Sequence, residues 1–163
     1  MTKMVEVRVP NGFSIRRIQK QDYEGVIKTL SILTTVGAVT EKQFGSIVEY
    51  WDTQKLPKGD VYKYNPYVIV EDSTGKVAAT GNVIIEQKLI HECGLVGHIE
   101  DIAVGSEFQG KKLGALLINK LTEVGLESGC YKIILDCDPK NVAFYEKCGF
   151  HTAGVEMQIK ANL

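Results

Sequence analysis

Apolar residues recur at helical spacing in two segments of the first third of the chain. Over residues 23–33 they stand three and four positions apart, and Asp22 is placed to cap the start of a helix. Thr40 and Gln43 form a capping-box pattern ahead of a second run of this kind, residues 44–51. The pattern therefore predicts two amphipathic helices.

Runs rich in β-branched residues predict strands before and after these helices. Polar turn residues at 72–75 separate two of the runs, which is typical of a β-hairpin, and a second turn is expected at 91–94. The predicted strands are residues 13–18, 67–71, 76–87 and a run that ends at Val104.

The last third of the chain alternates between strand and helix patterns. Helices are predicted over 113–128, with Gly129 after its end, and from Pro139 to a stop at Gly149. Strands are predicted at 132–137 and 155–159. A meander followed by a strand–helix–strand crossover implies a mixed α/β (α+β) sheet with helices on both faces. With no linker or repeat, residues 1–163 are expected to form one domain.

Composition restricts the classes of partner. A net charge of −1 over 163 residues gives no overall attraction to nucleic acid or an anionic membrane. No apolar run approaches the ~20 residues of a membrane span, and the first 20 residues lack the centre of a signal peptide. Cys93, Cys130, Cys137 and Cys148 have no metal-ligand spacing and lie in or beside apolar runs. We therefore expect a cytoplasmic protein with reduced thiols, no metal, no nucleic-acid partner and no membrane partner.

A glycine-bearing turn, residues 109–114, stands between the strand that ends at Val104 and the following helix. Unpaired N–H groups and the helix dipole make such a turn an anion site, and Lys111 and Lys112 add charge. Residues 105–112 nearly match the nucleotide-binding pattern G-x-x-x-x-G-K-[ST]. However, Lys112 stands where the hydroxyl that ligates Mg²⁺ is needed, and a meander precedes the turn. This disfavours a nucleotide hydrolase.

The strand before the turn favours a different phosphate. If the strand over 99–104 bulges, its N–H groups become free to bind an extended ligand arm. A pyrophosphate on the turn and an amide-bearing arm on the strand would together suit coenzyme A. A helix that carries Tyr145 is expected to face the same crevice.

These ordered motifs resemble the acetyl-CoA-dependent N-acetyltransferase superfamily with the GNAT fold. They are an acidic strand, a Gln-Gly-x-x-Leu-Gly turn and Asn-x-x-Phe-Tyr-x-x-x-Gly-Phe at 141–150. Residues 33–37, 97–104 and 130–137 are similar to the eukaryotic glucosamine 6-phosphate N-acetyltransferases, and the similarity runs from about Gly12 to Lys160. It implies a largely antiparallel twisted sheet of six to seven strands flanked by about four helices. One departure is Lys112, where the superfamily prefers glycine.

The resemblance implies a reaction and a cofactor site. Acetyl-CoA would acetylate the 2-amino group of glucosamine 6-phosphate by direct attack in a ternary complex, a step toward UDP-N-acetylglucosamine. We expect Asp136 to accept the amine proton, Tyr145 to act as the acid toward sulfur, and Glu100 to lie at the crevice. Because neighbouring strand residues face opposite sides, only one of Glu100 and Asp101 is expected to point at the sugar. The coenzyme would contact Ile102, Ala103, Val104, Gly110, Lys111, Lys112, Leu113, Gly114, Ala115, Tyr145, Glu146 and Lys147.

The same resemblance implies a set of substrate-binding residues and a dimer. Lys160, near the C-terminus, would be donated by the partner subunit of a homodimer, and as a lysine it gives a point charge where relatives often have the fork of an arginine. The sugar phosphate would contact Thr34, Lys88, Leu89, Ile90, His91, Glu100, Asp101, Ile102, Tyr131, Lys132, Asp136 and Lys160.

Each residue also has a plainer interpretation. Asp136 could cap the next helix, Tyr145 could be a core aromatic, and Lys88 and His91 could be surface residues. At the level of function, the same fold could acetylate an aminoglycoside, a polyamine or a peptide N-terminus, although the basic residues favour an anionic acceptor. A non-catalytic acyl-CoA sensor would keep the turn but would not need Asp136 and Tyr145.

Overall fold

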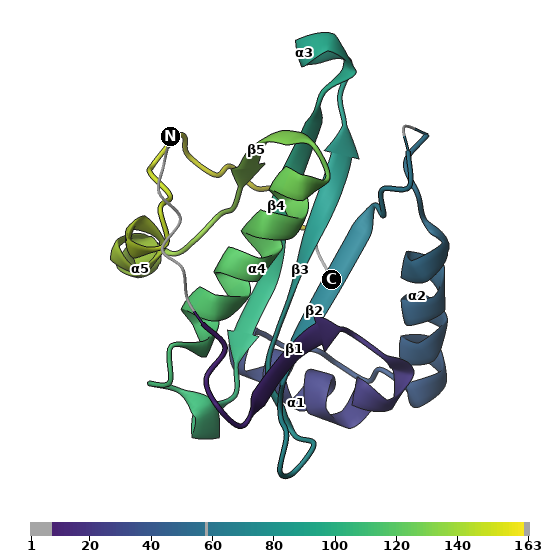
Figure 1. Ribbon diagram of the computed structural model, residues 1–163, viewed down its shortest axis with the longest axis vertical. Helices are drawn as coiled ribbons and strands as arrows, with labels where there is room; N and C mark the ends of the chain where they lie inside the picture. Colours follow the sequence, from purple (N-terminus) through teal and green to yellow (C-terminus); the bar gives the residue numbers. More distant parts are fainter. Residues whose placement is uncertain (1–7, 58, 162–163) are drawn as a thin grey trace.

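A five-stranded sheet organises the part of the chain that the computed structural model describes, residues 8–57 and 59–161 (Figure 1). Its order follows the sequence, and every neighbouring pair is antiparallel except β4 and β5, which are parallel. The strands are β1 (Phe13–Arg17), β2 (Tyr64–Glu71), β3 (Val77–Gln87), β4 (Leu95–Val104) and β5 (Cys130–Ile134). The parallel pair requires a crossover, which is supplied by α4 (Leu113–Glu127).

Helices cover both faces of the sheet. In β2, Ile69 packs with Leu117 and Leu121 of α4, whereas its neighbours Val68 and Val70 pack with Val26 of α1 (Tyr23–Leu33). Since successive strand residues point to opposite faces, α4 and α1 lie on opposite sides. The helix α2 (Glu41–Thr53) contributes Phe44 and Val48 to the α1 side, and α5 (Val142–Lys147) follows β5.

Local capping chemistry sets several helix ends as the sequence predicts. The Thr40 hydroxyl accepts the Gln43 N–H at 3.1 Å, and the Gln43 side chain accepts the Thr40 N–H at 2.9 Å, so the capping box at the start of α2 is complete. After α4, Gly129 has φ +92°, a left-handed conformation that favours glycine. Gly149 ends α5 in the same way, with φ +93°.

The structure corrects several predicted elements. The predicted strand at 155–159 is wrong, since residues 151–161 have no regular secondary structure, and the sheet has five strands in place of six to seven. Val155, Met157 and Ile159 are 91%, 92% and 99% exposed. Their alternation fits a strand, but a strand forms only against a neighbour, and none is present within the described chain.

Smaller differences concern strand ends and a turn. The strand β2 begins three residues earlier than predicted, at Tyr64, and β5 ends at Ile134 instead of continuing to residue 137. The expected turn near residue 91 is the short segment α3 (Ile90–Cys93), in which three consecutive residues from His91 have positive φ. With these element boundaries, most of the predicted site residues lie on β4 or on the segments beside it.

Candidate functional site

The strand β4 bulges at its acidic residues, which meets the condition that the sequence left open for a free ligand-binding backbone. Asn82 pairs with Glu100 and Thr80 pairs with Ala103, so one residue of β3 faces two of β4. Asp101 occupies the extra position with φ +55°, in the left-handed region that few non-glycine residues adopt. The sequence predicted that only one of Glu100 and Asp101 would point at the sugar, because side chains alternate along a regular strand. The bulge interrupts that alternation. As a result, Glu100 and Asp101 are both exposed.

The strand β4 loses its parallel neighbour just before the bulge. Pairing with β5 runs from Leu95 to His98 and stops where β5 ends at Ile134, while β4 continues to Val104. The chain after β5 leads away from β4 toward α5 (Figure 1). On this side, the backbone from Glu100 to Val104 therefore has no partner strand within the described residues, which leaves it available to an extended ligand arm.

The predicted phosphate turn joins η2 (Ser106–Phe108) to α4 through two left-handed residues. Gly110 has φ +80° and Lys112 has φ +60°. The positive φ gives a physical reason for a glycine preference at position 112, because a side chain is strained there. The Lys111 ammonium lies over the rings of Phe13 and Phe108, 5.4 and 5.6 Å from their centroids. Lys112 is exposed, and the first N–H groups of α4 follow it directly.

Three carboxylates meet near the bulge. Burial raises the pKa of Glu100, and the negative charges of Asp101 and Asp136 raise that pKa further. Asp136 itself is exposed and lies two residues beyond the end of β5. The structure thus brings together the acidic residues that the sequence placed at one site. Asp138, not Asp136, caps the next helix, since its carboxylate accepts the Lys140 N–H at 3.0 Å.

Tyr145 is half-buried at the end of this region. Its ring packs edge-on against Phe144 and Phe150, with centroids 5.0 and 6.3 Å away. Burial, with smaller contributions from the thiols of Cys137 and Cys148, raises the pKa of Tyr145, so its hydroxyl keeps a proton at neutral pH. Within the described residues the hydroxyl has no hydrogen-bond partner and can donate to a ligand. The core role and the acid role of Tyr145 are therefore compatible.

The residues predicted at 88–91 and 131–132 lie where β3 ends and where β5 begins. The His91 and Tyr131 rings lie in contact at a 36° tilt, with centroids 4.2 Å apart, and the Lys132 ammonium lies 5.8 Å from the Tyr131 ring centroid. Lys88 donates to Glu86 at 2.6 Å and so is not merely a solvated charge. Leu89 and Ile90 are 90% and 61% exposed.

Two predicted residues stand apart from this group. Thr34 is exposed at the C-terminal end of α1, and Lys160 is in the irregular C-terminal segment. Conversely, Glu86 and His98 lie beside the predicted residues but were not predicted from the sequence. Glu86 links Lys88 to His98, whose Nε2 is 2.7 Å from a Glu86 oxygen. The available signal was their spacing, since Glu86 precedes Lys88 by two residues and His98 precedes Glu100 by two.

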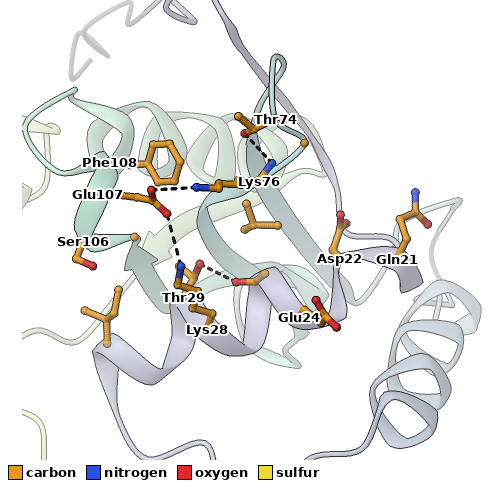
Figure 2. Close-up of a pocket in the computed structure, with 15 residues that line it drawn as sticks. Gln21, Asp22, Glu24, Lys28, Thr29, Thr74, Lys76, Ser106, Glu107 and Phe108 are labelled. Carbon is orange, nitrogen blue, oxygen red and sulfur yellow. Dashed lines mark hydrogen bonds and ion pairs between the residues drawn. The ribbon is translucent and has the colours of Figure 1, made fainter.

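A separate cavity of about 320 Å³ lies between α1, the β2–β3 turn and η2 (Figure 2). The ammonium groups of Lys28 and Lys76 are 3.6 and 3.2 Å from the Glu107 carboxylate, so both cations pair with this one carboxylate. None of the predicted site residues lines this cavity. We therefore assign the chemistry to β4 and its neighbours.

Two further observations concern the described residues. They contain no group of three or more His, Cys, Asp or Glu side chains arranged to hold a metal ion. None of the helices among them combines the length and the apolar character that a membrane crossing requires.

Comparison with known proteins places this site in a family. The sequence profile of the acetyltransferase (GNAT) family matches residues 37–150. The chain is 49% identical over 150 residues to a glucosamine 6-phosphate N-acetyltransferase of Candida albicans, covering 91% of this chain and 96% of the relative. The crystal structure of glucosamine-6-phosphate N-acetyltransferase from Arabidopsis thaliana is similar with a TM-score of 0.83 and 40% identity, covering 91% of this chain and 97% of that one. An acetyltransferase structure from Trypanosoma brucei has a TM-score of 0.82 at 27% identity, covering 91% and 99%. The bulged acidic strand, the glycine turn and the tyrosine helix thus occur in a chain that belongs to the GNAT family of acetyltransferases and groups there with relatives named glucosamine 6-phosphate N-acetyltransferase.

Proposed function

We propose that this enzyme transfers the acetyl group of acetyl-CoA to the 2-amino group of glucosamine 6-phosphate, giving N-acetylglucosamine 6-phosphate and CoA. The observation that carries the proposal is the continuous site along β4. It combines an anion-binding turn, a bulge with three carboxylates, and a basic cluster at one end of the sheet. The 49% identity to a relative of that name supports the same acceptor.

The coenzyme would be held mainly by backbone groups. The N–H groups at the start of α4 and the left-handed turn before it suit the pyrophosphate, with Lys112 adding a positive charge. The N–H groups of Ile102 and Val104, on the unpaired side of β4, suit the amides of the pantetheine arm. One of these N–H groups can face the thioester oxygen and stabilise the oxyanion that forms there.

The amine would be activated and placed by the carboxylates. Direct attack needs a neutral amine whose lone pair adds to the thioester carbon. An amino-sugar nitrogen loses its proton readily because the neighbouring oxygens withdraw electrons. Asp136 is the acceptor for that proton, directly or through water, while Glu100 and Asp101 orient the sugar. Holding the reactants in place supplies much of the acceleration.

Tyr145 would complete the reaction at sulfur. When the tetrahedral intermediate collapses, the carbon–sulfur bond breaks and the sulfur carries away the electron pair. The Tyr145 hydroxyl, like any phenol, is protonated at neutral pH, burial raises its pKa further, and it donates its proton to that sulfur. The nitrogen, which became positively charged on adding to the carbon, gives up its extra proton to water, and water returns a proton to the Tyr145 oxygen. The products are an amide and the free thiol of CoA.

The phosphate of the sugar would bind the basic cluster at the ends of β3 and β5. Lys88, His91 and Lys132 supply donors, and the contact of the His91 ring with the Tyr131 ring supports the position of the imidazole. Leu89 and Ile90 present exposed apolar surface and backbone groups beside them. Thr34, at the end of α1, would supply a hydroxyl.

A homodimer would complete this site. The alternating apolar side chains of Val155, Met157 and Ile159 are almost fully exposed, which is the pattern of a strand that lacks a neighbour. Pairing of this segment with a second copy would cover them and could carry Lys160 to the partner's phosphate site. The molar mass in solution, measured by light scattering, tests this assembly.

The acceptor is tested by measuring thiol release from acetyl-CoA with three amines: glucosamine 6-phosphate, glucosamine and a basic peptide. We expect the sugar phosphate to give the highest kcat/KM by at least tenfold over glucosamine, because the basic cluster binds its phosphate. Preference for the peptide would support a different acceptor on the same fold. No release with any amine would support a non-catalytic acyl-CoA sensor.

A further inference from the structure

One hydrogen-bonded chain crosses from β3 to β4 beside the proposed amine site. One carboxylate oxygen of Glu86 accepts from the Lys88 ammonium at 2.6 Å, and the other lies 2.7 Å from Nε2 of His98. The Glu86 and His98 side chains are 42% and 31% exposed, so bulk solvent screens this pair only in part. Glu86 therefore fixes the position of the imidazole.

The strand register places this imidazole on the same face as Glu100. His98 pairs with Ile84 and Glu86 pairs with Val96, which makes Glu86 and His98 diagonal neighbours on one face of the antiparallel pair. Residues two apart in a strand point to the same side, so Glu100 follows His98 on that face at about 6.6 Å along the strand. The bulge begins only after Glu100 and does not change this relation.

The charges around His98 are mostly negative. Partial desolvation and the carboxylates of Asp101, Asp136 and Glu156 raise the pKa of Glu100, and a positive charge on His98 acts in the opposite direction. The titratable and charged groups that face this region are Glu86 and Lys88 from β3, Glu100 and Asp101 from β4, Lys132 and Asp136 from β5 and the segment after it, and Glu156 from the C-terminal segment. Lys88 and Lys132 lie toward the phosphate end, so His98 is the cation placed next to Glu100.

We propose that His98, anchored by Glu86, is a positioning residue whose imidazolium lends its charge to the carboxylate of Glu100, so that Glu100 can accept a hydrogen bond from the amino sugar. The inference rests on the proposed function for its effect on the acceptor. A protonated Glu100 could not accept that hydrogen bond through the same oxygen.

The test replaces His98 with glutamine, whose amide nitrogen can still donate to Glu86 but carries no charge. For side chains whose backbone positions are about 6.6 Å apart on one face of a strand, in a partly solvated site, the loss should move the titration of Glu100 upward by about 0.5 pH unit. The acid limb of kcat/KM for glucosamine 6-phosphate should move by the same amount, with the KM for acetyl-CoA unchanged. His98→Arg, which restores a cation, should return the profile toward that of the unmodified enzyme.

Two comparisons separate this role from a structural one. In a Glu100→Gln background, His98→Gln should produce no further shift of the acid limb, because the group it acts on has gone. The control variant is Glu123→Gln, which breaks a Lys120–Glu123 pair of 2.6 Å and similar exposure on α4 and should leave the profile unchanged.

An NMR titration of Glu100, which does not depend on catalysis, decides whether His98 acts on this carboxylate. The carboxyl carbon of Glu100, labelled with ¹³C and identified by its loss in Glu100→Gln, is titrated by NMR in both proteins. An upward shift in His98→Gln supports the proposal, and identical titrations overturn it. If the unmodified enzyme released no thiol with the sugar phosphate, the proposed function would fail, yet this titration would still decide the role of His98.

Discussion

The contact between Gly81 and Ile102 links the stability of the sheet to the bulge of β4. A Cβ at Gly81 would lie 2.4 Å from Cδ1 of Ile102, and 3.2 Å from atoms of both Leu117 and Leu121 on α4. Ordinary carbon contacts begin near 3.5 Å, so Gly81→Ala forces Ile102 to move by about 1 Å or leave its rotamer. Position 81 therefore has no room for a side chain while the bulge keeps its shape.

The cost can be worked out from comparable changes. Overpacking costs about 1–3 kcal/mol, and the more restricted unfolded chain returns about 0.4–1 kcal/mol. We expect Gly81→Ala to lower the free energy of unfolding by about 0.5–2 kcal/mol. For a chain of this length, that corresponds to a fall in Tm of about 1–8 °C.

The assay is urea unfolding followed by circular dichroism, with two companion variants. Ile102→Val removes Cδ1, so Gly81→Ala with Ile102→Val should be more stable than the sum of the single changes by about 1 kcal/mol. Gly45→Ala is the control, because its new Cβ would meet only the flexible Lys20 side chain at 3.7 Å and should stabilise α2. Gly81→Ala with unchanged stability, or strict additivity in the double variant, would refute the reasoning.

Four other predictions follow from the site and the core. Tyr145→Phe should lower kcat by about ten- to a hundredfold with little change in KM, and an unchanged kcat would remove the acid role. Lys160→Ala should raise the KM for glucosamine 6-phosphate about tenfold and spare that for acetyl-CoA; equal effects on both would contradict its placement at the phosphate. Lys112→Gly should raise the free energy of unfolding by about 0.5–1 kcal/mol in urea titrations, since it relieves a left-handed residue, and a less stable variant would count against that strain. A thiol reagent should modify exposed Cys93 quickly but Cys130 only on unfolding, because burial raises the pKa of Cys130 to about 11; rapid modification of both in native protein would contradict this.

The raised pKa of Cys130 determines whether the protein gains or loses stability at high pH. The folded state retains the Cys130 proton up to about pH 11, whereas an ordinary thiol loses it near 9. Between these values the folded state holds more protons than the unfolded one. The stabilisation present below pH 9 is therefore lost as pH rises through this window.

Much of the fold could be predicted from local chemistry. The capping box of Thr40 and Gln43 and the stop at Gly129 depend on neighbours in the sequence, and both occur where predicted. The strand at 155–159 could not be judged in this way. Its alternating pattern is genuine, but strand formation depends on a partner that local sequence does not reveal.

The candidate site, like the fold, could be predicted where it depends on contiguous motifs but not where it depends on contacts between strands. The glycine turn and the acidic strand are contiguous motifs, and their chemistry could be inferred from composition and order. The bulge at Asp101 was conceivable from the sequence, yet its effect on Glu100 required the register with β3. Glu86 and His98 were missed because they meet diagonally across two strands, twelve residues apart in the chain.

The central claim is that an acetyl group moves from sulfur to the 2-amino nitrogen of the sugar phosphate. The most direct test is to incubate the enzyme with acetyl-CoA labelled with ¹³C in the acetyl carbonyl and with glucosamine 6-phosphate, and to record the carbon NMR spectrum of the product. We predict an amide carbonyl coupled to nitrogen in ¹⁵N-labelled sugar, formed in equal amount to free CoA thiol. An ester carbonyl on a sugar hydroxyl, or thiol release without a labelled sugar product, would contradict the account.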